Sequence, residues 1–242
     1  MKIFALLFML SGCVATYSTD MSEFDYVPIK TKTYEIATWQ RIKNQNNPRI
    51  HIYIEGDGNS FNAYGQPTAD PTPRNDMVRK LAEKDSFDNV VYMARPCQFI
   101  MDEHCKTSDW TTGRFSQDII DAQSETINKT AKGKIVTLIG YSGGAMVSGL
   151  IIKQNSDINF EKWITIAGVL NHQKWTQYFG DVPLTESLDM DILPNINQIH
   201  FIGGKDTIVP YDLAKQWTPK KDIVIMKNAT HNDFGDITLF DK

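Results

Sequence analysis

One serine of the chain stands in a setting that could make it a nucleophile. Residues 140–144 are Gly-Tyr-Ser-Gly-Gly, preceded by a mostly β-branched run at 135–139 and followed by the helix-compatible residues 145–152. This pattern predicts a strand, a sharp turn and a helix, with Ser142 at the turn. The flanking glycines tolerate the strained backbone that holds the hydroxyl at the top of a sheet. The alternative is that Ser142 only caps the helix.

A serine nucleophile needs a base, and the base needs a carboxylate that orients it. Asp206 follows the predicted strand at residues 198–202 behind two glycines. His231 lies in a polar loop just after residues 222–226. Both side chains therefore follow predicted strands, at the sheet edge where ligands collect. We expect His231 to be the base and Asp206 the acid, and the alternative for Asp206 is a helix cap.

Other residues compete for these two roles. His172 follows a strand end, but it precedes Asp206 and so departs from the order serine, acid, histidine expected for this kind of sheet. Asp233 is a weaker alternative for the acid because it is too close in sequence to His231 to orient it from behind. The remaining histidines lie in strand patterns or in a presumed disulfide loop: His51, His200 and His104.

Ester chemistry at a serine also needs N–H donors for the tetrahedral oxyanion. One donor is the backbone N–H of the residue after the nucleophile, Gly143. The second is expected from the glycine-rich loop that follows the predicted strand at residues 49–55. The Asp57 N–H is the first choice there and Gly58 the second. The alternative for this loop is an ordinary tight turn.

The elements that must position these residues alternate along the chain. Strands are predicted at residues 33–41, 49–55, 89–94, 134–139, 162–167, 198–202 and 222–226, and helices at 75–84, 116–130, 143–154 and 211–217. Several strands are apolar on both faces, as in sheets covered by helices on each side. The alternation predicts an α/β fold with one doubly wound, mostly parallel sheet and an antiparallel pair at its start.

The N-terminus has the pattern of an export signal. Lys2 precedes eight apolar residues at 3–10, a run too short to span a membrane, which takes about 20 residues. Residues 10–13, Leu-Ser-Gly-Cys, resemble the lipobox of bacterial lipoproteins. That resemblance implies a signal peptide at residues 1–12 and a lipid such as palmitate on Cys13. The alternative is an ordinary secretory signal with an incidental cysteine.

The lipoprotein resemblance also bears on location. Val14, rather than aspartate, follows the cysteine, which resembles the signal for outer-membrane sorting in the bacterial cell envelope. Residues 13–30 then form a lipidated tether, and residues 31–242 form the folded domain, long enough for a sizeable core. The formal net charge of −4 without a basic cluster gives no case for nucleic-acid binding.

Two cysteines remain besides Cys13. Cys97 and Cys105 form an even pair in an exported chain, which predicts a disulfide that closes a short loop. The alternative is a metal site with Asp102 and His104, but the segment lacks the further convergent ligands of a usual zinc centre. We therefore expect no metal.

Taken together, these motifs resemble the α/β-hydrolase superfamily over residues 33–240. The likeness is carried by residues 140–144, 203–210 and 230–231, and three more segments, 94–99, 110–116 and 171–175, resemble a group of small exported bacterial hydrolases. The resemblance implies an α/β-hydrolase fold and a serine hydrolase that needs no cofactor. One departure is Glu55-Gly56 where many esterases have His-Gly. A carboxylate there puts negatively charged substrates in doubt.

A short cap segment is expected between residue 167 and the Asp206 loop. Its aromatic residues could line an acyl pocket, or the segment could be a small loop packed by its own apolar residues. The candidate pocket residues are Glu55, Gly58, Tyr141 and Trp175. So short a rim favours small to medium acyl groups over the substrates of a long-chain lipase.

The function predicted from these residues is that of a carboxylesterase acting on a small-molecule ester through an acyl-enzyme on Ser142. A thioesterase, acyltransferase or peptidase would use the same groups. A different class of function also stays open: a non-catalytic envelope lipoprotein that uses the fold as a binding module.

Overall fold

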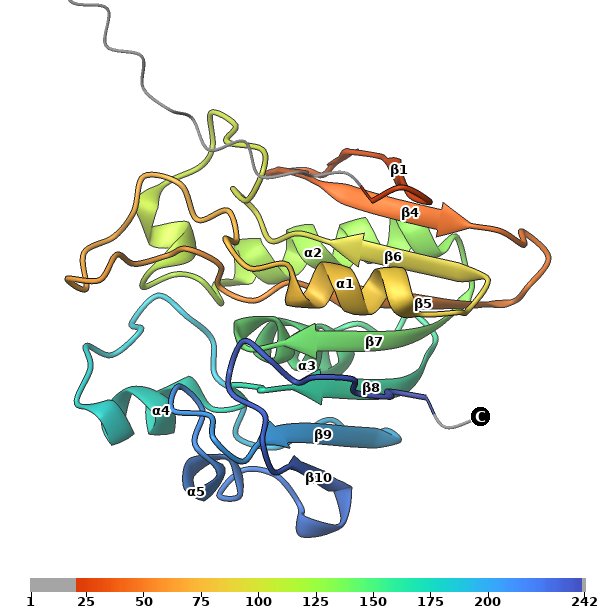
Figure 1. Cartoon of the computed structure of the whole chain (residues 1–242). Coiled ribbons are helices and arrows are strands. Elements are labelled where there is room, and N and C mark those ends of the chain that lie inside the picture. Colours follow the sequence, from red (N-terminus) through yellow and green to blue (C-terminus); the bar gives the residue numbers. More distant parts are fainter. Residues whose placement is uncertain (1–20, 241–242) are drawn as a thin grey trace, which may run out of the picture.

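The computed structural model describes residues 21–240. An eight-stranded sheet with the strand order β1-β4-β6-β5-β7-β8-β9-β10 forms its centre (Figure 1). The six strands from β5 to β10 are parallel, whereas β1 and β4 are antiparallel to their neighbours. The strands of this sheet are β1 Asp25–Tyr26, β4 Thr38–Ile42, β5 Arg49–Ile54, β6 Asn89–Met93, β7 Ile135–Tyr141, β8 Phe160–Ile166, β9 Gln198–Gly203 and β10 Ile223–Met226, and a separate hairpin pairs β2 Ile29–Lys30 with β3 Glu35–Ile36.

Helices pack on both faces of the sheet, because its strands are apolar on both. The helices are α1 Met77–Lys84, α2 Gln117–Ala131, α3 Gly143–Gln154, α4 His172–Phe179 and α5 Tyr211–Ala214, with 3-10 turns at Thr107–Trp110 and Lys220–Asp222. One apolar cluster joins α2 and α3 to side chains such as Ile52, and the other joins α1 to side chains such as Tyr53. Successive residues of β5 thus face opposite layers. The predicted doubly wound, mostly parallel sheet is confirmed.

The folded part begins earlier than the predicted boundary at residue 31. Met21 is only 3% exposed, and Asp25–Tyr26 pairs with β4. The prediction of a tether through residue 30 is therefore wrong from Met21 onward, because this segment covers an otherwise open edge of β4. The predicted signal peptide, residues 1–12, and the lipid site Cys13 lie outside the described residues.

Two further details differ from the sequence prediction. The antiparallel pairing expected at the start of the sheet is present, but it does not join the first two predicted strands: β4 is antiparallel to β1 and β6, and β6 lies between β4 and β5. The segment expected as a cap contains a helix, α4. The Asn171 side chain caps it by accepting the Lys174 N–H at 2.8 Å, and Gly180 ends it with a φ of 70°.

The predicted pairing of Cys97 with Cys105 is present as a disulfide. Neither sulfur is then a free thiolate for a metal, and Asp102 is used for hydrogen bonds to the N–H groups of Glu35 and His104. Within residues 21–240, no group of three or more His, Cys, Asp or Glu residues could hold a metal ion. No helix in the same range is both long and apolar enough to cross a membrane.

Candidate active site

Ser142 occupies the turn between β7 and α3 in a strained conformation. Its φ is 50° and its ψ is −120°, a region that few non-glycine residues adopt. A Cβ on Gly140 would lie 2.5 Å from the carbonyl oxygen of Gly144, and one on Gly144 would lie 2.4 Å from that of Glu55. Glycine is therefore required at both positions, because backbone packs directly against them. The Ser142 N–H donates to the Ile166 carbonyl at 2.9 Å, which ties the turn to β8.

The structure brings Ser142, His231 and Asp206 together from three distant parts of the chain. His231 Nε2 lies 3.0 Å from Ser142 Oγ, and His231 Nδ1 lies 2.9 Å from Asp206 Oδ2. The other oxygen of Asp206 accepts the N–H groups of Ile208 and Val209, each at 2.8 Å. Because a carboxylate accepts the Nδ1 proton, the Nε2 lone pair is left facing the serine hydroxyl.

The two residues predicted to supply the oxyanion donors lie in contact with each other, since a Cβ on Gly143 would lie 1.9 Å from Asp57 Oδ1. Gly143 is the first residue of α3, and Asp57 follows β5 at the same edge of the sheet. Within residues 21–240, neither backbone N–H has a hydrogen-bond acceptor. A pair of such N–H groups at a helix N-terminus suits an anionic oxygen.

Glu55 is buried under this loop and makes two hydrogen bonds. Its carboxyl accepts the Gly56 N–H at 2.9 Å and the Tyr92 hydroxyl at 2.8 Å. Burial raises the pKa of Glu55 to about 7, although both hydrogen bonds act to lower it. Burial therefore disfavours the charged form of this carboxyl, so it repels an anionic substrate less than expected from the residue type.

Two arginines that sequence reasoning did not assign to the site lie beside Asp57. Arg95 Nη1 is 3.1 Å and Arg114 Nη1 is 2.8 Å from the Asp57 carboxylate. Burial opposes ionisation of Asp57, but the two guanidinium groups outweigh it and lower its pKa. Arg95 comes directly after β6, at the carboxyl edge of the sheet, and this position was the signal that could have marked it.

A pocket of about 370 Å³ opens over Ser142 and His231. All four candidate pocket residues line it, together with several apolar side chains and Arg114: Glu55, Gly58, Phe61, Arg114, Phe115, Tyr141, Val169, Trp175, Leu184 and Ile208. The indole N–H of Trp175 donates to the Ile208 carbonyl at 2.8 Å, which joins the α4 segment to the Asp206 loop.

The competing candidates lie elsewhere. His172 is only 2% exposed and stacks on Phe115 with ring centroids 5.8 Å apart, away from Ser142. Burial lowers its pKa. The Asp233 carboxylate accepts the Gly235 N–H at 2.8 Å and makes no hydrogen bond to His231. Neither residue is placed to act on the serine.

Comparisons with known proteins identify the family and the fold. A protein-family model described as serine hydrolase (FSH1) matches residues 75–232, a range that contains Ser142, Asp206 and His231. A search of curated proteins found no match.

Solved structures show the fold. An α/β serine hydrolase without lid from Xanthomonas campestris, XC6422, is 16% identical with a TM-score of 0.57, covering 87% of this chain and 86% of its own. The esterase Pf2001 from Pyrococcus furiosus is 14% identical with a TM-score of 0.58, and the match covers 87% of this chain and 84% of the esterase. An α/β serine hydrolase homologue from Coxiella burnetii is 15% identical with a TM-score of 0.56, and the match covers 86% of this chain and 89% of the homologue. The fold is therefore that of an α/β hydrolase.

Proposed function

The chain belongs to the serine hydrolase (FSH1) family, and from this membership and the site geometry we propose that it is a carboxylesterase for small to medium acyl esters. The observation that carries the proposal is the position of His231. Its ring lies 3.0 Å from the Ser142 hydroxyl and 2.9 Å from the Asp206 carboxylate. This is the arrangement that a serine needs to become a nucleophile.

In the proposed reaction, Ser142 Oγ attacks the ester carbonyl while His231 Nε2 takes the serine proton. Asp206 stabilises the imidazolium that forms and holds its Nδ1–H in place. The N–H groups of Asp57 and Gly143 bind the oxyanion. His231 returns the proton to the leaving alcohol, and an acyl-enzyme remains on Ser142. Water, with His231 as base, then releases the acid.

The size of the pocket supports the choice of substrate class. Its volume of about 370 Å³ is near the lower end of ligand pockets. Apolar side chains form part of its lining: Phe61, Val169, Trp175 and Leu184. Such a lining suits a short or medium acyl chain.

A fluorophosphonate probe and 4-nitrophenyl esters of increasing chain length test the proposal. We expect the native chain to label at one site and to turn over the esters, with Ser142→Ala losing both. Ser156→Ala, which removes an exposed hydroxyl, is the matched control and keeps both. A folded native chain that neither labels nor turns over any ester would contradict the proposal and favour a binding module.

The location is proposed separately, from the sequence. We propose that a lipid on Cys13 anchors the protein in the bacterial envelope at the outer membrane. Palmitate labelling and membrane fractionation of the full chain and its Cys13→Ala variant test this. Release of the variant into the soluble fraction without label supports the anchor, and an unlabelled native chain contradicts it.

A further inference from the structure

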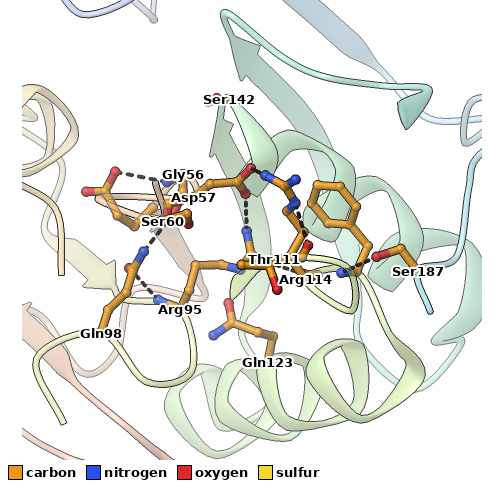
Figure 2. Close-up of polar contacts among 12 residues, drawn as sticks. Gly56, Asp57, Ser60, Arg95, Gln98, Thr111, Arg114, Gln123, Ser142 and Ser187 are labelled. Carbon is orange, nitrogen blue, oxygen red and sulfur yellow. Dashed lines mark hydrogen bonds and ion pairs between the residues drawn. The ribbon is translucent and has the colours of Figure 1, made fainter. Parts of the chain in front are cut away.

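The side chain of Asp57 lies between two buried guanidinium groups (Figure 2). Arg95 donates to one carboxylate oxygen at 3.1 Å and Arg114 to the other at 2.8 Å. The arginine side chains are 5% and 7% exposed, and that of Asp57 is 22% exposed. Removing one partner from such a buried pair is costly, because it leaves a charge without its counter-ion away from water. The three residues are called the clamp below.

Both arginines are themselves fixed to backbone. The Arg114 Nε–H donates to the Thr111 carbonyl at 2.8 Å, and Arg95 Nη2 donates to the Arg114 carbonyl. The Arg95 N–H donates to Gln98 Oε1 at 3.0 Å, and Gln98 Nε2 donates to the Gly56 carbonyl at 2.9 Å. The loop after β5 is therefore hydrogen-bonded to two other loops: the one that follows β6 and the one that precedes α2.

The Asp57 carboxylate also contacts the serine turn, through the same Oδ1 that accepts from Arg95. A Cβ on Gly143 would lie 1.9 Å from Asp57 Oδ1, so the carboxylate packs directly on the start of α3. Gly58, the next loop residue, has a φ of 66°, and a Cβ there would lie 2.1 Å from the Pro71 carbonyl oxygen. The loop is therefore closely packed at Gly58, and the Asp57 side chain is packed between the two arginines and Gly143.

We propose that the clamp of Arg95, Asp57 and Arg114 positions the Asp57 N–H as an oxyanion donor beside Gly143. The inference rests on the proposed esterase function. Arg95 and Arg114 act through Asp57 as positioning residues. The clamp also has two positive charges and one negative charge, which places net positive charge near the oxygen that becomes negative in the transition state.

Steady-state kinetics on a 4-nitrophenyl ester test the clamp. Loss of a single oxyanion donor lowers kcat by about 10²–10³-fold. We expect Arg114→Gln, which displaces rather than removes the donor, to lower kcat by about 10–100-fold with KM changed less than about twofold. Arg114→Lys should recover part of the loss because it keeps a cation and one donor. Arg49→Gln is the control, since Arg49 pairs with Glu161 and its side chain is 49% exposed.

A second readout separates positioning from general damage to the fold. An alkyl boronic acid forms a tetrahedral adduct on the serine, and this adduct uses the oxyanion donors. Its inhibition constant should rise in Arg114→Gln by about the same factor as kcat falls. Asp57→Asn and Arg114→Gln should also lower kcat in the double variant by less than the product of their separate effects, because both break the same clamp.

The outcomes distinguish the clamp from the esterase proposal. Labelling by a fluorophosphonate, given long incubation, shows that Ser142 is intact in each variant. If Arg114→Gln labels fully, stays folded and keeps the native kcat and boronic-acid affinity, the clamp is wrong and the esterase proposal stands. If the native chain itself does not label or turn over ester, the esterase proposal fails first and the clamp fails with it.

Discussion

Two histidine–aspartate pairs lie at opposite ends of the strands of the same mostly parallel sheet. At the carboxyl edge, His231 Nδ1 is 2.9 Å from Asp206; at the amino edge, His51 Nδ1 is 2.7 Å from Asp85. By this distance alone the two pairs are equivalent. Their surroundings differ, because His231 lies against Ser142, the residue that directly precedes Gly143 at the start of α3.

His51 is instead enclosed by aromatic rings. It stacks between Phe87 and Phe240 at centroid distances of 4.0 and 4.2 Å, and the Tyr53 hydroxyl donates to the same Asp85 oxygen at 2.9 Å. The second pair therefore joins β5, the end of α1 and the C-terminal segment. A His–Asp pair therefore takes part in catalysis only where the fold also supplies a nucleophile and oxyanion donors.

Replacing each histidine by glutamine should give the largest difference in activity between the two pairs. His231→Gln should lower kcat/KM by about 10⁵-fold, because the serine loses its base. His51→Gln should leave kcat within about twofold of the native value. Ester turnover by both purified variants checks this, and a comparable loss in His51→Gln would show that the amino-edge pair takes part in activity.

Replacing each aspartate by asparagine should give the next largest difference in activity. Asp206→Asn should lower kcat by about 10⁴-fold, since an amide cannot hold the imidazole in its productive tautomer. Asp85→Asn should keep native turnover, because no reacting group lies near it. Circular dichroism of Asp206→Asn confirms that it is folded. Native activity in that variant would remove Asp206 from the mechanism.

Asp85 should act on stability. Burial opposes its ionisation, but the hydrogen bond and charge of His51, together with hydrogen bonds from the Phe87 N–H and the Tyr53 hydroxyl, outweigh burial and lower the Asp85 pKa below its ordinary value of 3.8. The ionised form therefore stabilises the fold at neutral pH, and this stabilisation is lost as the pH falls below about 4. We expect Asp85→Asn to lower the free energy of unfolding at pH 7 by about 2 kcal/mol. Urea titrations at pH 7 and 3.5 check that the deficit shrinks in acid.

The smallest effects should come from the tyrosine beside each pair. Tyr53→Phe removes one hydrogen bond to Asp85 and should cost about 1 kcal/mol of stability with kcat unchanged. Tyr141→Phe removes the bonds to the His231 carbonyl at 3.1 Å and to Asn232 at 2.7 Å. It should lower kcat by about threefold, because these bonds hold the loop that carries the base. A fall in kcat for Tyr53→Phe with native kcat for Tyr141→Phe would contradict the placement of catalysis at the carboxyl ends of the strands.

Much of the carboxyl edge follows from local sequence. Ser142 could be placed because glycines and a β-branched strand mark a strand–turn–helix, and Asp206 and His231 because each follows a strand. The partners of Asp57 could not be placed in this way. Arg95 and Arg114 lie 38 and 57 residues from it, and no spacing rule links residues on different loops.

The sequence by itself determined the alternation of strands and helices, the turn at Ser142 and the order of the candidate catalytic residues, since these depend on local backbone preference and periodicity. Only the tertiary structure decided which histidine meets the serine, that residues 25–26 complete the sheet edge, and that two arginines enclose Asp57. Those outcomes depend on which strands become neighbours, and neighbours in a parallel sheet are distant in sequence.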